Sequence, residues 1–260
     1  MGKIFTYSFH DLARSRWMLI YFVFFLLLAS SLFVFVNDPS KVIISLLNVV
    51  LYLCPLIALV ICVTYFYSSL DFVELLLAQP ITRTSIFWGQ YLGVSTSLAL
   101  SFTLGVTLPF LLFGILVSTE ISNFLILIIA GIFLTYIFAA LAFMIVLRFQ
   151  NRIKGFGIAI LVWLLLSVFY DGILLLVLFL FSDYPLENFA LTASLLNPID
   201  LSRVLILLKL DISALMGYTG AVFQRFFGSG LGIGLSISVL LIWTIVPFLL
   251  IRRIALRRDF

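Results

Sequence analysis

Few side chains in this sequence could take part in chemistry, and the one that stands out is an aspartate. Asp171 follows Tyr170 deep within a long apolar run. A charge in hydrocarbon costs at least about 2.5 kcal/mol on insertion scales, so this carboxyl group should face a helix bundle or a wet cavity. Two interpretations of this pair stay open. The carboxyl group is either a proton, ion or gating site, or it is held by a hydroxyl such as that of Tyr170 or Ser167.

Motifs of established chemistry do not occur elsewhere in the sequence. There is no Gly-x-x-x-x-Gly-Lys-Ser/Thr motif, so we do not expect this chain to bind ATP in the P-loop manner. The single histidine, His10, does not belong to a His-Glu-x-x-His motif. Cys54 and Cys62 would lie about 12 Å apart along one helix, too far for a disulfide. We therefore predict no catalytic residue, no metal site and no directly bound cofactor.

The composition excludes a water-soluble fold. Of the 260 residues, 64% are hydrophobic and 10% are charged, whereas a soluble domain carries about 25% charged residues. The net charge of +4 does not indicate nucleic-acid binding, because the basic residues flank apolar runs instead of lining one solvated face. We expect a protein that contacts membrane lipid and no nucleic acid.

The apolar runs predict an all-α integral membrane protein in which residues 1–260 form a single transmembrane domain. Each run is long enough to cross a bilayer, which takes roughly 20 helical residues. Residues 1–16 mix apolar and charged side chains, as an amphipathic helix at the membrane interface does. Residues 182–229 hold too many apolar side chains for a solvated linker, so we predict a helical extracytoplasmic platform there. The six expected spans are 17–36, 45–67, 91–117, 123–147, 156–181 and 230–251.

The distribution of Lys and Arg predicts the orientation. Residues 1–16, the loop after the second span, the loop at 148–154 and the tail after 251 carry 11 of the 15 basic residues. Because basic loops stay in the cytoplasm, we expect both termini there and the platform outside, in a multi-pass protein of the bacterial inner membrane.

Residues 68–90, between the second and third spans, have the features of a loop that receives a partner. An apolar run after Glu74 ends at Pro80, since proline does not fit inside a helix. A polar turn and an amphipathic piece follow, and we expect the latter to form a short helix across the end of the bundle. The alternative is an ordinary re-entrant or interfacial loop. The candidate contact residues are Glu74, Pro80, Thr82, Arg83, Thr84, Phe87 and Trp88.

This order of features resembles the coupling loop in permeases of the type-2 ABC exporter family. Such loops read Glu-Leu-Leu-Leu, two residues, Pro, and then a Ser/Thr/Arg turn, as Glu74 to Ser85 do here. The segment before Glu74 departs from the pattern, because it lacks the extra acidic and glycine residues that are common in the family. Later blocks are similar to the permeases that serve the maturation of nitrous oxide reductase, namely residues 161–171, 195–205 and 214–217.

The resemblance implies a larger complex. Its other members would be a second copy of the permease, separate cytoplasmic ABC ATPase subunits that hold ATP-Mg, and a periplasmic β-helical copper-handling protein. ATP-driven motion would pass outward for assembly of the copper–sulfide site of the reductase, with a sulfur species or copper as the cargo, if any. Residues 182–229 would then dock the periplasmic protein, with candidate contacts at Asn197, Asp200, Arg203, Met216 and Tyr218.

Two other functions are weighed against this one. An exporter permease for a lipid, drug or glycan would have a wide polar or aromatic path between two copies. A stand-alone channel or intramembrane enzyme would need a ring of pore residues or a catalytic pair, and the sequence offers neither.

Overall fold

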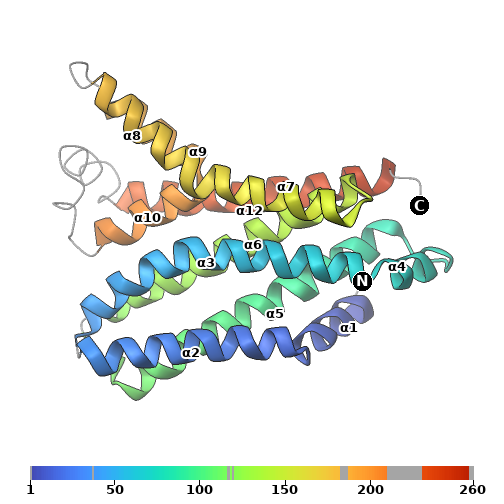
Figure 1. Cartoon of the computed structure of the whole chain (residues 1–260), viewed down its shortest axis with the longest axis horizontal. Helices are drawn as coiled ribbons and strands as arrows, with labels where there is room; N and C mark the ends of the chain where they lie inside the picture. Colours follow the sequence, from blue (N-terminus) through green and yellow to red (C-terminus); the bar gives the residue numbers. More distant parts are fainter. Residues whose placement is uncertain are drawn as a thin grey trace.

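The computed structural model describes residues 2–36, 38–115, 118, 120–181, 187–209 and 230–257. Throughout these residues the regular structure is helical (Figure 1). The main helices are α1 (Gly2–Ala13), α2 (Arg16–Val36), α3 (Pro39–Ser68), α4 (Leu70–Leu77), α5 (Arg83–Leu112), α6 (Ile121–Arg148), α7 (Arg152–Leu164), the π-helical turn η2 (Leu165–Phe169), α8 (Tyr170–Leu180), α9 (Glu187–Leu196), α10 (Pro198–Lys209) and α12 (Gly230–Arg257).

Six of these units are long and apolar enough to cross a membrane. They are α2, α3, α5, α6, the continuous run α7–η2–α8, and α12. The predicted all-α fold with six spans is therefore confirmed. The run α7–η2–α8 is called the fifth span below, and α12 the sixth.

Local signals in the sequence explain where several helices begin. The carboxylate of Asp38 accepts a hydrogen bond from the backbone N–H of Ser40 at 3.0 Å, and Pro39 occupies the first turn of α3. The side chain of Asn151 caps α7 in the same way, by accepting from the N–H groups of Ile153 and Lys154. Pro55 lies within α3 without ending it, as prolines in membrane helices often do.

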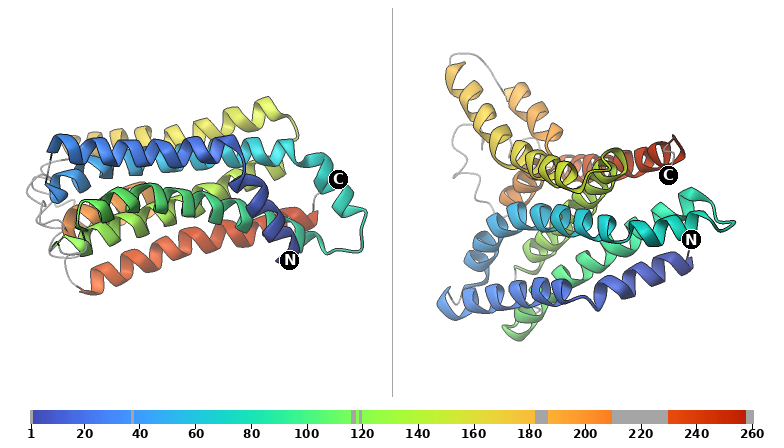
Figure 2. Two further views of the ribbon diagram at one scale, coloured as in Figure 1. Left: turned by 90° about the horizontal axis from the view of Figure 1, so that it is seen from below. Right: turned by 45° about the vertical axis from the view of Figure 1, so that its right-hand side comes forward.

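The core lies between α3, α5 and α6, and the other spans pack around it. The fifth span rests on α3 and α6, α12 rests on α5 and α6, and α2 rests on α5 and α3 (Figure 2). Buried aromatic rings join these helices edge to face, as Phe66 of α3 and Phe143 of α6 do at 4.9 Å between centroids. Figure 1 places α1, α4 and the last turns of α12 at one end of the bundle. The ends of α2 and α8 lie at the other.

Helix α1 packs on α5 through a glycine. A Cβ atom added to Gly93 would lie 2.8 Å from Cβ of Ser8 and 2.9 Å from the carbonyl oxygen of Phe5. Ile4, Ser8 and Leu12 of α1 are buried. The amphipathic helix expected at residues 1–16 thus forms at Gly2–Ala13, and its inner face is held by the bundle. Small residues permit this approach because they let two helix backbones come close.

The third span begins earlier than the sequence analysis predicted. The short helix expected at residues 80–88 does not form as a separate element. Residues from Arg83 onward are instead the first turns of α5, where Phe87 packs on α3 and Trp88 packs on α12. The separate short helix at this end is α4, which precedes Pro80 and ends in a turn.

The described part of the predicted platform packs into the bundle instead of lying on its outer surface. Helices α9 and α10 meet at a bend of 116°, and α10 contacts α3, α6 and α12. Ile199 and Leu201 of α10 are fully buried. The bend falls at Asn197-Pro198, where a proline in the first turn favours a new helix start. Residues 210–229 lie outside the described part of the chain.

The contact of α1 with α5 yields a test of packing. Gly93→Ala should lower the free energy of unfolding by about 1–3 kcal/mol, because the added methyl group meets backbone atoms of α1 that cannot move aside. Gly157→Ala is the matched control, since a Cβ atom at Gly157 meets nothing within 4 Å. Thermal unfolding of both variants in detergent measures the difference. Equal melting temperatures would contradict the close approach of α1.

Candidate functional site

The fifth span changes its helical pitch directly before Asp171. Residues Leu165–Phe169 form the π-helical turn η2, and α8 begins at Tyr170. A π turn inserts an extra residue into a helix, and such turns are frequent at functional sites. The hydroxyl group of Ser167 donates to the carbonyl oxygen of Trp163 at 2.7 Å, so it is engaged within this same stretch.

Asp171 forms an ion pair with Arg203 of α10. Nη1 of Arg203 lies 2.6 Å from Oδ2 of Asp171 and 3.1 Å from Oδ1 of Asp200. All three side chains are at least three-quarters buried, with exposed fractions of 18% for Asp171, 22% for Arg203 and 6% for Asp200. The hydroxyl partner considered for Asp171 is thus wrong. Its partner is a cation on another helix, while the Tyr170 hydroxyl donates to the carbonyl oxygen of Ala193 at 2.6 Å.

Asn197 connects the bend between α9 and α10 to the π-helical turn. Its Oδ1 accepts from the backbone N–H of Ile199 at 3.1 Å, which caps the start of α10. Its Nδ2 donates to the carbonyl oxygen of Leu166 at 2.7 Å and approaches Oδ2 of Asp200 at 3.4 Å. Asn197 itself is fully buried. One amide therefore fixes both the helix start and its distance from the fifth span.

Tyr52 brings α3 into the same network. Nη2 of Arg203 donates to the Tyr52 hydroxyl at 2.9 Å, and the guanidinium carbon lies 5.8 Å from the centre of the Tyr52 ring. The backbone carbonyl of Tyr52 accepts from Nε1 of Trp163 at 3.1 Å. We call Tyr52, Asp171, Asn197, Asp200 and Arg203 the ion-pair cluster. It joins α3, the fifth span and α10.

The cluster unites residues that the sequence analysis had assigned to two different roles. Asn197, Asp200 and Arg203 were expected to be exposed contacts for a periplasmic protein, and their burial corrects that expectation. Asp171 was expected to be an intramembrane polar residue, and it lies beside them. Tyr52 was missed, because a single tyrosine in an apolar helix gives no signal of its own. Met216 and Tyr218, the other predicted docking residues, lie outside the described residues.

A second surface lies at the end of the bundle that carries α1 and α4. Glu74, Pro80, Thr82 and Arg83 are exposed there, and Thr84 is partly exposed. The remaining two predicted contact residues point inward. Phe87 is fully buried and stacks on Phe66 of α3 at 5.9 Å, and Trp88 stacks on Phe248 of α12 at 4.4 Å.

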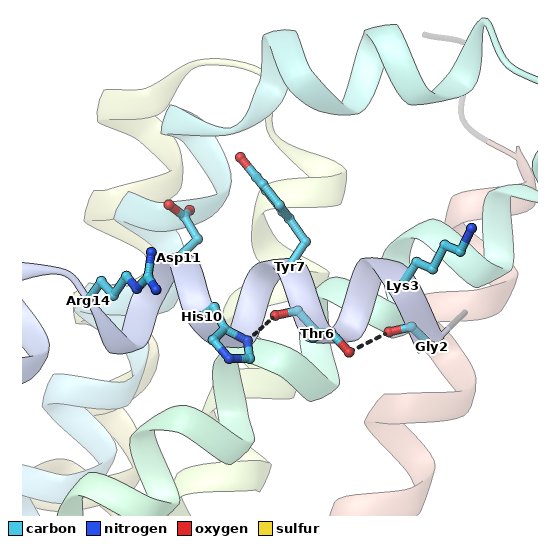
Figure 3. Close-up of a pocket in the computed structure, with 7 residues that line it drawn as sticks. All are labelled: Gly2, Lys3, Thr6, Tyr7, His10, Asp11 and Arg14. Carbon is cyan, nitrogen blue, oxygen red and sulfur yellow. Dashed lines mark hydrogen bonds between the residues drawn. The ribbon is translucent and has the colours of Figure 1, made fainter.

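Helix α1 borders this surface. Tyr7 stacks on Phe72 of α4 at 4.8 Å between ring centroids. Figure 3 shows an open pocket along α1, with Tyr7 and Asp11 pointing to one side and Thr6 and His10 to another. The Thr6 hydroxyl donates to the carbonyl oxygen of Gly2. Nδ1 of His10 lies 2.8 Å from the carbonyl oxygen of Thr6. We call the exposed residues of α4 and of the turn at 78–83, together with the open face of α1, the terminal-side surface.

Neither region contains a recognisable metal centre. Within the described ranges, no three His, Cys, Asp or Glu side chains gather as metal ligands would. Cys54 and Cys62 are buried thiols on α3, and the hydroxyl group of Tyr21 donates to Sγ of Cys54 at 3.6 Å. These thiols pack as small apolar groups of the core.

Comparison with known proteins does not extend these observations, since no protein-family model and no curated protein matches the chain. The resemblance noted in the sequence therefore rests on its residues alone.

The ion-pair cluster can be tested against a pair with the same spacing. Arg203→Gln should cost about 3–5 kcal/mol of stability, because it leaves the two buried carboxyl groups and their negative charge without a cation. Lys41→Gln is the matched control. Lys41 pairs with Asp38 three residues earlier, as Arg203 does with Asp200, but its side chain is 71% exposed, so we expect at most about 1 kcal/mol. Asp171→Asn should cost less stability than Arg203→Gln, because it leaves the carboxyl group of Asp200 paired with the guanidinium group of Arg203.

Melting temperatures of the four proteins in detergent provide the measurement. A loss in Lys41→Gln as large as that in Arg203→Gln would show that the buried network contributes no more than a surface pair.

Proposed function

We propose that this chain is the membrane-spanning subunit of an ABC transporter of the exporter type, driven by ATPase subunits that are separate polypeptides. The observation that carries the proposal is the terminal-side surface, where the family-like sequence that starts at Glu74 forms the end of the short helix α4 and a turn before α5 begins at Arg83. Exposed polar residues there would meet the ATPase. Leu75, which is 68% exposed on α4, would supply an apolar contact beside Glu74.

The packing of this region supports a mechanical role. Helix α4 follows α3 with only Ser69 between them, and the backbone N–H of Ser69 donates to the carbonyl oxygens of Tyr65 and Phe66. On the other side of the turn, α5 is held to the bundle by the inward-pointing Phe87 and Trp88. A force applied to α4 would therefore reach α3 directly, because a single residue separates these two helices, and would reach α5 through the turn at residues 78–82.

Two routes would carry such a force to α9 and α10. The first is α12, which contacts Trp88 through Phe248 and holds α9 through Trp243, whose Nε1 donates to the carbonyl oxygen of Leu195 at 3.3 Å. The second is α3, which runs from the start of α4 to Tyr52 in the ion-pair cluster. Spatial continuity is a structural argument, and coupling itself needs a functional test.

The finer proposal concerns the assembly and its task. We propose that two copies of the chain act with two ATPase subunits and a periplasmic copper-handling protein in maturation of the nitrous oxide reductase copper–sulfide site. The fifth span leaves most of its surface free for a second copy. Only 6% of its most apolar 18-residue stretch is buried within the chain. The periplasmic protein would dock within residues 182–229, by contacts other than the buried Asn197, Asp200 and Arg203.

Cross-linking through an introduced cysteine tests whether the terminal-side surface contacts an ATPase subunit. Glu74→Cys should cross-link to a nucleotide-binding subunit when the complex is treated in membranes, because Glu74 lies exposed on α4. Asp38→Cys is the matched control, since Asp38 is another partly exposed acid and lies at the opposite end of the bundle. The two native cysteines are buried and should contribute no background.

Identification of the cross-linked polypeptide by mass spectrometry decides the result. Capture of an ATPase at Asp38→Cys but not at Glu74→Cys would reverse the proposed orientation. A chain that purifies alone from mild detergent and cross-links to no ATPase at either position would contradict the transporter assignment.

A further inference from the structure

The ion-pair cluster contains more negative charge than positive. Asp171 and Asp200 both contact Nη1 of Arg203, at 2.6 and 3.1 Å, and the other terminal nitrogen of Arg203 serves Tyr52. Two ionised carboxylates beside one guanidinium group leave a net charge of −1. Such a charge is costly within an apolar bundle unless a further positive partner is present.

The hydrogen bonds of the cluster point to the same deficit. Oδ1 of Asp171 is buried and has no hydrogen-bond partner in the described part of the chain. Oδ2 of Asp200 has Asn197 as its donor, at a long 3.4 Å. Buried carboxylate oxygens normally accept at least one good hydrogen bond. Among the described side chains, the cluster therefore lacks a donor as well as a positive charge.

No described side chain of a neighbouring element supplies either. The titratable and charged groups that face the two carboxyl groups are Arg203 from α10, Tyr52 from α3 and Tyr170 from the fifth span. The Tyr170 hydroxyl donates to a backbone carbonyl of α9 instead. Among the described side chains, α6, α9 and α12 contribute no ion pair to Asp171 or Asp200. Leu196, the residue of α9 that directly precedes Asn197, has an apolar side chain.

We infer that the ion-pair cluster is a proton-binding site in which Asp171 and Asp200 share one proton. A proton taken up from water gives one of the two carboxyl groups an O–H donor and brings the net charge of the cluster to zero. Two carboxyl groups close to one another titrate as a pair, because the charge on the first opposes ionisation of the second. Asp171 is 18% exposed at the surface of the isolated chain, so the carboxyl group is not sealed within the chain's own core.

Release of the proton has a structural consequence. Asp171 belongs to the fifth span and Asp200 to α10, so the restored negative charge would push these two elements apart across Arg203. The same site would thus make the contact between the fifth span and the α9–α10 pair depend on pH. This inference does not rest on the proposed ABC assembly, since it concerns the isolated chain.

Infrared spectroscopy of the full chain in lipid vesicles tests the inference directly. Protonated carboxyl groups show a C=O stretching band that carboxylates lack. We expect such a band to persist well above pH 4, the ordinary range of an aspartic acid, and to disappear as the pH is raised further. Asp171→Asn and Asp200→Asn should each remove this pH-dependent band. Asp38→Asn should leave it unchanged, because Asp38 is 43% exposed and lies outside the cluster.

A thermal measurement on the unmodified chain provides an independent readout. The folded chain would hold a proton that the unfolded chain has already released, so its stability must fall as the pH rises through the titration. Absence of the band from the unmodified chain would overturn the inference, whatever the variants do. Survival of the band in both cluster variants would overturn it as well, as would a site that binds sodium ions with both carboxylates ionised.

Discussion

The arrangement of the described helices depends on how the positive charge of one guanidinium group, that of Arg203, is neutralised inside an apolar bundle. Arg203 cannot be buried without negative charge beside it, and the two carboxyl groups that it contacts lie on different elements. Asp200 lies one turn earlier on the same helix, whereas Asp171 lies on the fifth span. The helix α10 is therefore fixed against that span by charge, and against α3 by the hydroxyl group of Tyr52. Apolar packing alone would not fix the position of these helices along one another. An apolar side chain is about as stable against lipid as it is against another helix.

Polar groups of the backbone reinforce the same arrangement. The carbonyl of Leu166 in the π-helical turn accepts from Asn197, and the carbonyl of Tyr52 accepts from Trp163. Each of these bonds joins two helices through a side chain and a main-chain atom. Few such donors exist in a chain with 10% charged residues, and four of the cross-helix bonds converge on this one region. That concentration explains why the bend between α9 and α10 occurs inside the bundle.

The sequence predicted the parts of the fold that depend on apolar length. Six long apolar runs were enough to place six spans, although α3 begins at Pro39 and not at residue 45. It did not predict that α5 begins at Arg83, because the stacking of Trp88 on Phe248 joins residues far apart in the chain. Nor could it distinguish burial in a bundle from burial in lipid, so the apolar residues of α10 were assigned to an outer surface.

The residues of the candidate site were likewise predicted in part, and their contacts were not. Asp171 and Arg203 each suggested a functional position by being charged in an apolar setting, but their pairing spans 32 positions and depends on the bend at Asn197. Tyr52 became visible only through its contacts with Arg203 and Trp163. On the terminal-side surface, the polar residues of the predicted coupling loop are largely exposed, whereas Phe87 is a core residue and Trp88 packs partly buried against the core.

We propose that the terminal-side surface and the α9–α10 pair respond together to nucleotide, although they lie on different parts of the bundle. Hydrogen–deuterium exchange of the assembled complex, with and without ATP on its nucleotide-binding subunits, tests this most directly. The account predicts that nucleotide changes the exchange of backbone amides both in α4 and in residues 187–209. A change confined to α4 and the start of α5, with identical exchange across α9 and α10 in the two states, would contradict it.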